Sequence, residues 1–166
     1  MPEFSGNTVA IALGSNMGNR LAHLQQAINA IKLCGFQITA LSSVWETAPW
    51  GDTDQPRFLN MCLTADTEMS GADALDRVKK IEKDLGRTVS RHWGPREIDI
   101  DIIIFGEEII RTEKLTIPHP MMQDRAFVLC PLAEIAPDMK HPVLNKSVKE
   151  LFEALPPENM VRIIKL

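Results

Sequence analysis

The apolar positions in the first two thirds of the chain predict four strands and two helices. Short runs of apolar and β-branched residues are typical of strands, and they occur at 8–13, 37–47, 58–67 and 97–105. Apolar residues repeat at helical spacing over 20–34 and 70–85, and each segment is followed or ended by a glycine. This order of elements is that of the ferredoxin-like split βαβ arrangement. The sequence therefore predicts an α+β fold, in which helices pack on a largely antiparallel sheet.

The segments between and after these elements are rich in turn-forming residues. Gly14, Ser15 and Asn16 predict a turn that ends the first strand. Residues 48–56 and 86–95 are dense in Pro, Gly and charged residues, which predicts two loops long enough to take part in function. Further on, short helices are expected within 121–134 and 147–155, and a closing strand at 161–166. Since no internal repeat or linker is visible, we expect a single domain over 1–166.

Composition and charge exclude several classes of protein. With 45% hydrophobic and 24% charged residues among 166, the chain is typical of a globular domain. Its net charge of −4 argues against duplex nucleic acid as the main partner. No apolar run is long enough to cross a bilayer, and the first residues lack the basic region of a secretion signal. The scattered Cys34, Cys62 and Cys130 predict free thiols in a reducing cytoplasm rather than disulfides or a zinc site.

The segment WGPREIDIDIII, residues 93–104, carries the strongest chemical signal in the chain. Alternate side chains of a strand share a face, so Asp99 and Asp101 are expected to point away from the isoleucines around them, about 6–7 Å apart. Two such carboxylates suit Mg²⁺, and a pair of metal ions is a recurring device in phosphoryl chemistry. An ordinary strand with a solvated acidic face would show the same alternation and remains the alternative.

Basic residues lie on both sides of this segment, at Arg87, Arg91, His92, Arg96, His119 and Arg125. Carboxylates beside arginines suit a polyphosphate bound together with Mg²⁺. A solvated surface charge is the alternative for each arginine, and the better interpretation for Arg91. Because the chain lacks the Lys-Ser/Thr of a phosphate-binding Walker A loop, any nucleotide would have to be held by metal and arginines.

A second candidate site surrounds the first loop, where Phe58 and Asn60 share one face of a predicted strand and Trp45, Thr47 and Trp50 lie nearby in sequence. An aromatic ring beside an amide can stack on a flat heterocycle and form hydrogen bonds with it. Core packing is the alternative for Phe58. Asn60 favours the functional interpretation, because a buried amide needs hydrogen-bond partners.

Taken together, these residues make the chain resemble the 6-hydroxymethyl-7,8-dihydropterin pyrophosphokinases of folate biosynthesis. The resemblance covers nearly the whole chain, through ALGSNMGNR (12–20), SSVWETAPWG (42–51), DQPRFLN (54–60), RHWGPREIDIDI (91–102), LTIPHP (115–120) and DRAFVLCPLAEIAP (124–137). It implies a ferredoxin-like α/β sandwich and a monomeric, cytoplasmic enzyme that acts on small molecules. The implied reaction transfers the β,γ-pyrophosphoryl group of ATP to the pterin hydroxymethyl oxygen and releases AMP.

The resemblance also implies roles for single residues. Asp99 and Asp101 would hold two Mg²⁺ ions between the triphosphate and the pterin hydroxyl, with Arg87 and Arg96 as further catalytic residues. The pterin would lie between Phe58 and Phe127. Its polar edge would be read by Asn60 and by the backbone around Thr47, Ala48 and Trp50. The nucleotide would contact Glu82, Arg87, Trp93, Arg96, Ile102, Lys114, Thr116, His119 and Arg125.

In this family, loops corresponding to 48–56 and 88–92 close over the substrates and exclude water. The chain departs from the family at Val89 and His92, where arginines are common, and at Ala48 and Pro120. The two lost arginines support one alternative, a pterin- or nucleotide-binding module of the same fold that produces no AMP. The other alternative, a ferredoxin-like domain that binds nucleic acid, conflicts with the net charge of −4 and with the acidic strand.

Overall fold

The computed structural model describes residues 6–47, 54–86, 97–159 and 163–165. A six-stranded sheet forms its centre, and every strand pairing in it is antiparallel. The strand order is β5-β1-β4-β3-β8, and β2 also pairs with β4. These strands are β1 (Asn7–Ser15), β2 (Gln37–Leu41), β3 (Trp45–Thr47), β4 (Phe58–Thr67), β5 (Asp99–Phe105) and β8 (Ile163–Lys165).

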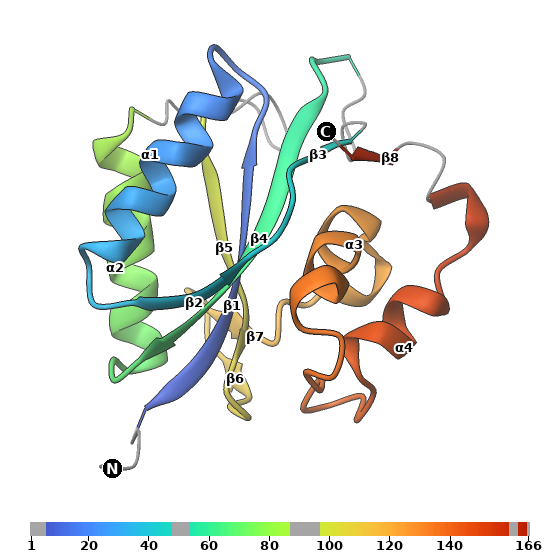
Figure 1. The fold of residues 1–166 in the computed structure, drawn as a ribbon. Helices are drawn as coiled ribbons and strands as arrows, with labels where there is room; N and C mark the ends of the chain where they lie inside the picture. Colours follow the sequence, from blue (N-terminus) through green and yellow to red (C-terminus); the bar gives the residue numbers. More distant parts are fainter. Residues whose placement is uncertain (1–5, 48–53, 87–96, 160–162, 166) are drawn as a thin grey trace.

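Helices cover both faces of the sheet (Figure 1). The helices α1 (Arg20–Lys32) and α2 (Gly71–Asp84) lie on one face, and α3 (Ala126–Ile135) and α4 (Val148–Glu153) lie on the other. Two short 3-10 helices, η1 (Met122–Asp124) and η2 (Pro157–Asn159), precede α3 and follow α4. A small second sheet joins β6 (Ile110–Arg111) to β7 (Thr116–Ile117). The predicted α+β, ferredoxin-like class is confirmed.

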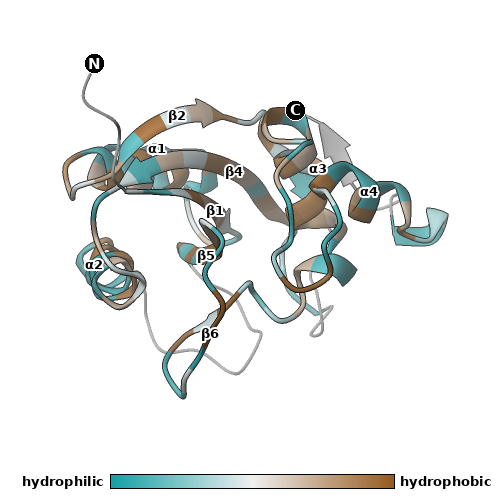
Figure 2. Ribbon diagram, turned by 90° about the horizontal axis from the view of Figure 1, so that it is seen from below, coloured by the Kyte–Doolittle hydropathy of each residue, from teal (hydrophilic) through white to brown (hydrophobic). Residues whose placement is uncertain are grey.

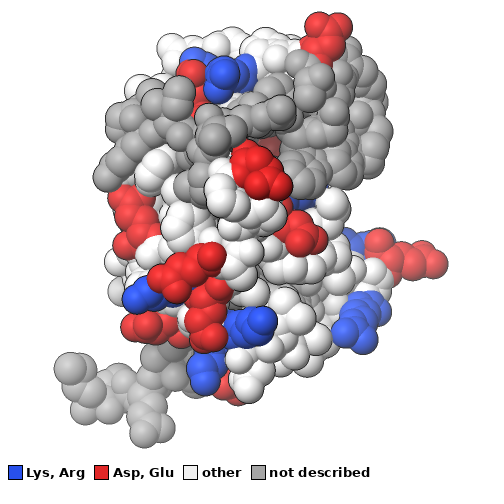
Figure 3. Space-filling view, turned by 90° about the vertical axis from the view of Figure 1, so that its right-hand side faces the viewer, with Lys and Arg blue, Asp and Glu red and all other residues white. Residues whose placement is uncertain are grey.

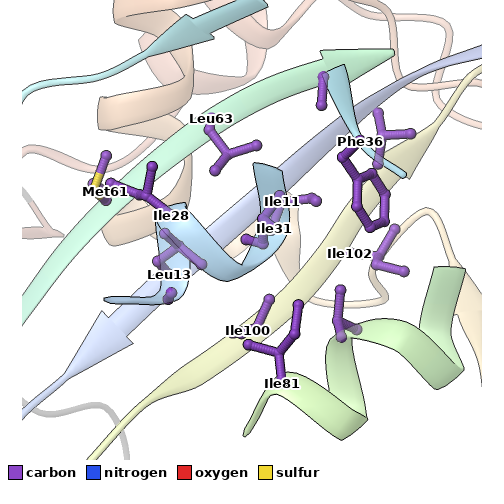
Figure 4. Packing of buried hydrophobic residues seen from close by; sticks show 14 of the residues in the cluster. Ile11, Leu13, Ile28, Ile31, Phe36, Met61, Leu63, Ile81, Ile100 and Ile102 are labelled. Atoms are coloured by element: carbon purple, nitrogen blue, oxygen red, sulfur yellow. The ribbon is translucent and has the colours of Figure 1, made fainter. Parts of the chain in front are cut away.

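The alternation of side chains along the strands divides the apolar residues between two cores. Val9, Ile11 and Leu13 of β1 belong to the larger core under α1 and α2, whereas Ala10 belongs to the smaller core under α3 and α4. Figure 4 shows side chains of the larger core, among them Leu63 and Ile100, lying between the strands and the helices. In Figure 2 hydrophobic residues concentrate on the strands and on α3, with hydrophilic residues toward the loops.

Several element boundaries differ from those predicted. β1 continues through Gly14 and Ser15, because both residues pair with β4, so the predicted turn begins later. The strand predicted at 37–47 is two strands, separated at Ser42. There the Ser42 N–H donates to the carbonyl of Cys62 at 2.9 Å, while the Ser42 hydroxyl accepts the N–H of Cys62 at 2.9 Å. A side chain thus replaces one backbone partner in the ladder. The pairing of β6 with β7 was not predicted.

We predict that the larger core dominates stability. Leu63 is fully buried in it, so Leu63→Ala should lower the free energy of unfolding by about 2–5 kcal/mol through lost burial and a residual cavity. Leu33 is 86% exposed, and Leu33→Ala makes the same chemical change at the surface. It should alter stability by no more than about 0.5 kcal/mol. Urea unfolding measures both, and equal losses in the two variants would contradict the assignment of the core.

Candidate active site

Strand register places three polar or aromatic side chains and a glycine in one row across the sheet. Gly14 of β1 pairs with Asp99 of β5 on one side and with Asn60 of β4 on the other, and Asn60 pairs in turn with Trp45 of β3. Directly opposed residues of antiparallel strands point to the same face. The face is that of α3, because Cys62, two residues beyond Asn60, packs in the smaller core and donates its thiol to the carbonyl of Val128 at 3.5 Å.

Asp101 lies in the adjacent row, opposite Ala12, and shares this face with Asp99. Burial and the neighbouring Asp99 carboxylate raise the pKa of Asp101 to about 7. The positive charges of Lys79 and Arg125 act in the opposite direction and do not offset this rise. A cation held between the two carboxylates would relieve their repulsion. Among the described residues no group of three or more His, Cys, Asp and Glu side chains is arranged to hold a metal ion.

Gly14 makes room for the Asn60 side chain. A Cβ atom at Gly14 would lie 2.8 Å from Oδ1 of Asn60 and 3.5 Å from Cδ1 of Phe58. The amide nitrogen of Asn60 donates a short hydrogen bond to the hydroxyl of Thr47, which orients the amide. Three of the predicted pterin-site residues, Thr47, Phe58 and Asn60, are therefore neighbours. Sequence reasoning treated Gly14 as a turn residue, and its role becomes visible only with the strand register.

The start of α3 brings further predicted residues to this side of the sheet. The Arg125 guanidinium lies over the ring of Phe127, with Cζ 5.4 Å from the ring centroid, and donates to Sδ of Met121 at 3.4 Å. The backbone N–H of His119 donates to the carbonyl of Ile103 at 2.9 Å, which ties this segment to the edge of β5. Burial and the charge of Arg125 lower the pKa of His119 to about 4, so its imidazole is neutral at pH 7.

Not every predicted nucleotide contact lies on this face. The side chain of Ile102 is buried in the larger core together with Ile100, on the opposite face from the two aspartates. Only the backbone of Ile102 could therefore make the predicted contact with the nucleotide. Glu82 of α2 is buried and accepts the Ile100 N–H at the edge of β5 at 2.9 Å, and it pairs with Lys79 at 3.0 Å.

Lys114 and Thr116 are exposed in the hairpin that β6 and β7 form next to β5. Five predicted site residues fall outside the described residues: Ala48, Trp50, Arg87, Trp93 and Arg96. Their roles stay predictions. On the side of the molecule seen in Figure 3, Lys and Arg are interspersed with Asp and Glu, and the described residues form no continuous basic surface there.

Two side chains bind the chain on either side of residues 48–53: Asn16 in the connection from β1 to α1, and Arg20 at the start of α1. The sequence predicted no ligand for this connection. The buried Asn16 amide donates to Oε1 of Gln55 and to the carbonyl of Pro56, each at 2.9 Å. Arg20 forms an ion pair with Glu46 of β3 at 3.3 Å and donates to the carbonyl of Arg57 at 2.9 Å. These contacts fix where the chain leaves β3 and where it enters β4.

We predict that Gly14→Ala disturbs the site more than the fold. The added methyl group would collide with the Asn60 amide, so this side chain must move and its hydrogen bond to Thr47 must weaken. The side-chain NH₂ resonances of Asn60 in a ¹H–¹⁵N spectrum, assigned through Asn60→Asp, should shift strongly. Backbone resonances of α4 should stay in place. Unchanged Asn60 resonances would contradict the close approach.

A second prediction concerns pH. Because the pKa of folded His119 lies below its ordinary value of 6.5, protonation favours the unfolded chain. The contribution of His119 to stability is therefore complete above about pH 6.5 and is lost as pH falls toward 4. Urea unfolding from pH 7.5 to 4.5 should show a shallower loss in His119→Gln than in the unsubstituted protein. Parallel pH profiles, or a His119 ring resonance that titrates near pH 6.5, would contradict this.

Comparison with known proteins shows the family of the chain. Residues 10–137 match the family model HPPK, described as 7,8-dihydro-6-hydroxymethylpterin-pyrophosphokinase. The chain is 41% identical over 155 residues to an Aquifex aeolicus protein named 2-amino-4-hydroxy-6-hydroxymethyldihydropteridine pyrophosphokinase, with 93% of this chain and 94% of that protein covered. A Bacillus subtilis protein of the same name is 45% identical over 130 residues, with 78% of each chain covered.

Solved structures show the same fold. The chain resembles a Plasmodium falciparum HPPK-DHPS crystal structure with a TM-score of 0.73 at 18% identity, over 92% of this chain. It spans 44% of the length of that protein. No helix among the described residues is long and apolar enough to cross a membrane. Because the family model covers most of the chain and the relatives exceed 40% identity, this chain belongs to the 7,8-dihydro-6-hydroxymethylpterin-pyrophosphokinase family.

Proposed function

We propose that the chain transfers pyrophosphate from ATP to the hydroxymethyl group of 6-hydroxymethyl-7,8-dihydropterin, giving the dihydropterin pyrophosphate and AMP, in folate biosynthesis. The observation that carries this proposal is the shared face of the sheet. One row holds Asp99 and Asn60 on either side of Gly14, and Asp101 lies in the next row. A carboxylate pair suited to a metal ion therefore shares this face with an amide suited to a heterocycle, which supports the proposal.

The pterin half of the site would be built from β4, β3 and the start of α3. Phe58 and Phe127 are both half-buried, so their rings are partly accessible to a ligand. Both stacking and burial would contribute to the binding free energy of a flat bicyclic ring between two aromatic side chains. The hydrogen bond to Thr47 holds the Asn60 amide in place, and the donor and acceptor groups of this amide would pair with the polar edge of a pterin.

The carboxylate half of the site fits magnesium. Asp99 and Asp101 offer carboxylate oxygens on adjacent rows of one face, and burial together with the Asp99 carboxylate raises the pKa of Asp101, an effect that a bound cation would counter. Mg²⁺ is commonly bound through one or two carboxylates together with substrate phosphate oxygens. We therefore propose that these two residues hold two Mg²⁺ ions. When bound, Mg²⁺ would neutralise charge on the transferring phosphate groups.

The remaining residues would act by positioning and by charge. Arg125 lies near enough to both Asp101 and His119 to alter their pKa values, which supports a role in which its guanidinium would bind a phosphate oxygen beside the carboxylates. His119 is neutral at pH 7 and would contribute hydrogen bonding without charge. Phosphoryl transfer depends mainly on positioning and charge stabilisation, so no general base is assigned. We also propose Arg87 and Arg96 as phosphate ligands, on the resemblance alone.

We further propose that the protein acts as a monomer in the cytoplasm on small molecules. The described residues include three cysteines, Cys34, Cys62 and Cys130, all of them free thiols. Burial raises the pKa of the Cys62 thiol far above its ordinary value, which keeps this group protonated and unreactive.

An AMP-release assay with ATP, Mg²⁺ and 6-hydroxymethyl-7,8-dihydropterin tests the proposal. We expect AMP only when pterin and metal are both present, and a chelator should abolish it. Asp101→Asn should lower turnover about 100-fold or more, because a carboxylate that would hold the charge-neutralising Mg²⁺ is lost. Its melting temperature should stay the same or rise, because a buried negative charge and its repulsion with Asp99 are both removed.

Asp76→Asn is the matched control, because Asp76 is exposed on α2 and lies outside the site. It should turn over like the unsubstituted protein. Binding of pterin and ATP without any AMP would favour the non-catalytic binding module instead. Full turnover in Asp101→Asn would show that the carboxylate pair is not the metal site.

A further inference from the structure

The last turn of α3 is hydrogen-bonded to the chain where β3 begins. Glu134 of α3 accepts the backbone N–H of Ser43 at 2.9 Å and the Ser43 hydroxyl at 2.5 Å. The same carboxylate accepts the indole N–H of Trp45 at 3.4 Å. One side chain thus joins α3 to the start of β3. Glu134 is 91 residues from Ser43 and 89 residues from Trp45 in the sequence. The proposed reaction assigns no role to Glu134.

β3 carries two of the side chains that surround Asn60. Trp45 is the direct partner of Asn60 in the β3–β4 pairing and shares its face. Thr47, two residues further along β3, accepts the hydrogen bond of the Asn60 amide. A shift of the start of β3 would therefore move both neighbours of the amide that we assign to the pterin edge.

α3 carries the other wall of the proposed pterin site. Phe127 precedes Glu134 by seven residues, which is about two helical turns, so both side chains lie on the same side of α3. A helix moves largely as a rigid body, so fixing Glu134 against β3 also limits how Phe127 can move relative to β3 and β4. Phe58, the opposing aromatic residue, lies in β4 opposite Thr47.

We propose that Glu134 is a positioning residue for the pterin site. It sets α3 against β3 and thereby the spacing between Phe127 on the helix and Phe58 and Asn60 on the sheet. Glu134 does not itself contact the substrate. This inference rests on the proposed function, because it concerns the same pterin site. It predicts a selective effect on the pterin, since the two aspartates lie on β5, across β1 and β4 from β3.

Binding measurements on Glu134→Ala and Glu134→Gln test this role. By isothermal titration calorimetry, Glu134→Ala should weaken 6-hydroxymethyl-7,8-dihydropterin binding about fivefold, the effect of losing one or two exposed hydrogen bonds. Its affinity for ATP with Mg²⁺ should change by less than about twofold. We count a change smaller than this as no effect. Glu134→Gln keeps one carbonyl acceptor for Ser43 or Trp45 and should recover most of the pterin affinity. In turnover, the KM for pterin should rise while kcat is largely kept.

Glu150→Ala is the matched control. Glu150 of α4 accepts the Ser147 N–H at 3.2 Å in a capping box, so this variant also removes a carboxylate that accepts a backbone N–H. Ser147 is the N-cap of α4 and Glu150 lies in its first turn, so neither residue belongs to β3 or β4. Glu150→Ala should lower stability without changing the affinity for pterin. The indole N–H resonance of Trp45, assigned through Trp45→Phe, should shift in Glu134→Ala and stay unchanged in Glu150→Ala.

The outcomes separate this inference from the proposed function. If the unsubstituted protein binds pterin and forms AMP but Glu134→Ala keeps full pterin affinity, the positioning role is wrong and the proposed function stands. Equal losses of pterin and ATP affinity in Glu134→Ala would also overturn the role, since they indicate a general structural effect. If the unsubstituted protein binds no pterin, the proposed function fails, and the positioning role fails with it.

Discussion

The antiparallel pairing of β1 with both β4 and β5 is the constraint on which the proposed site depends. Gly14 is opposed to Asp99 on one side and to Asn60 on the other, so a single register aligns the acidic and the amide halves of the site. A shift of either pairing by one residue would turn that half to the opposite face of the sheet. The apolar residues of β4 and β5 oppose such a shift, because Met61 and Leu63, or Ile100 and Ile102, would then leave the larger core.

One face of the sheet contributes most of the apolar core, and the other face carries the residues of the proposed site. The face under α1 and α2 is filled with large aliphatic side chains and holds most of the buried apolar residues. Among the described residues, α3 and α4 cover the opposite face toward one end of the strands, where Ala10, Ile104 and Leu129 belong to the smaller core. Toward the other end, the same face carries Asp99 and Asn60 instead. Burying these polar groups in the larger core would lower the stability of the fold, and their position on the opposite face avoids this.

Side-chain hydrogen bonds connect the separate pieces that surround this face. Asn16 and Arg20 hold the chain on both sides of 48–53 from the connection between β1 and α1. Glu134 joins α3 to the start of β3, and His119 joins the segment before α3 to the edge of β5 through its backbone. Each bond crosses between elements that are distant in sequence. The site thus depends on contacts that hold its walls as well as on the residues that would meet a ligand.

The order of the first strands and helices, the fold class and the facing of Asp99 and Asp101 could be predicted from the sequence, because each follows from local periodicity. The sandwich of Phe58 and Phe127 came from resemblance and stays a proposal. Local patterns misjudged Gly14, since a glycine before Ser-Asn has the same signature in a turn and at the end of a strand. They were also silent on the small sheet of β6 and β7, whose two-residue strands are too short to show a period.

By itself, then, the sequence determined where the main strands and helices lie and which face of β5 its aspartates and isoleucines take, because these depend on neighbours along the chain. Only the tertiary structure decided that Gly14 leaves space for Asn60 and that Glu134 reaches Ser43. Those two relations depend on register and on the packing of distant elements. No local pattern of residues encodes the distance between two such elements.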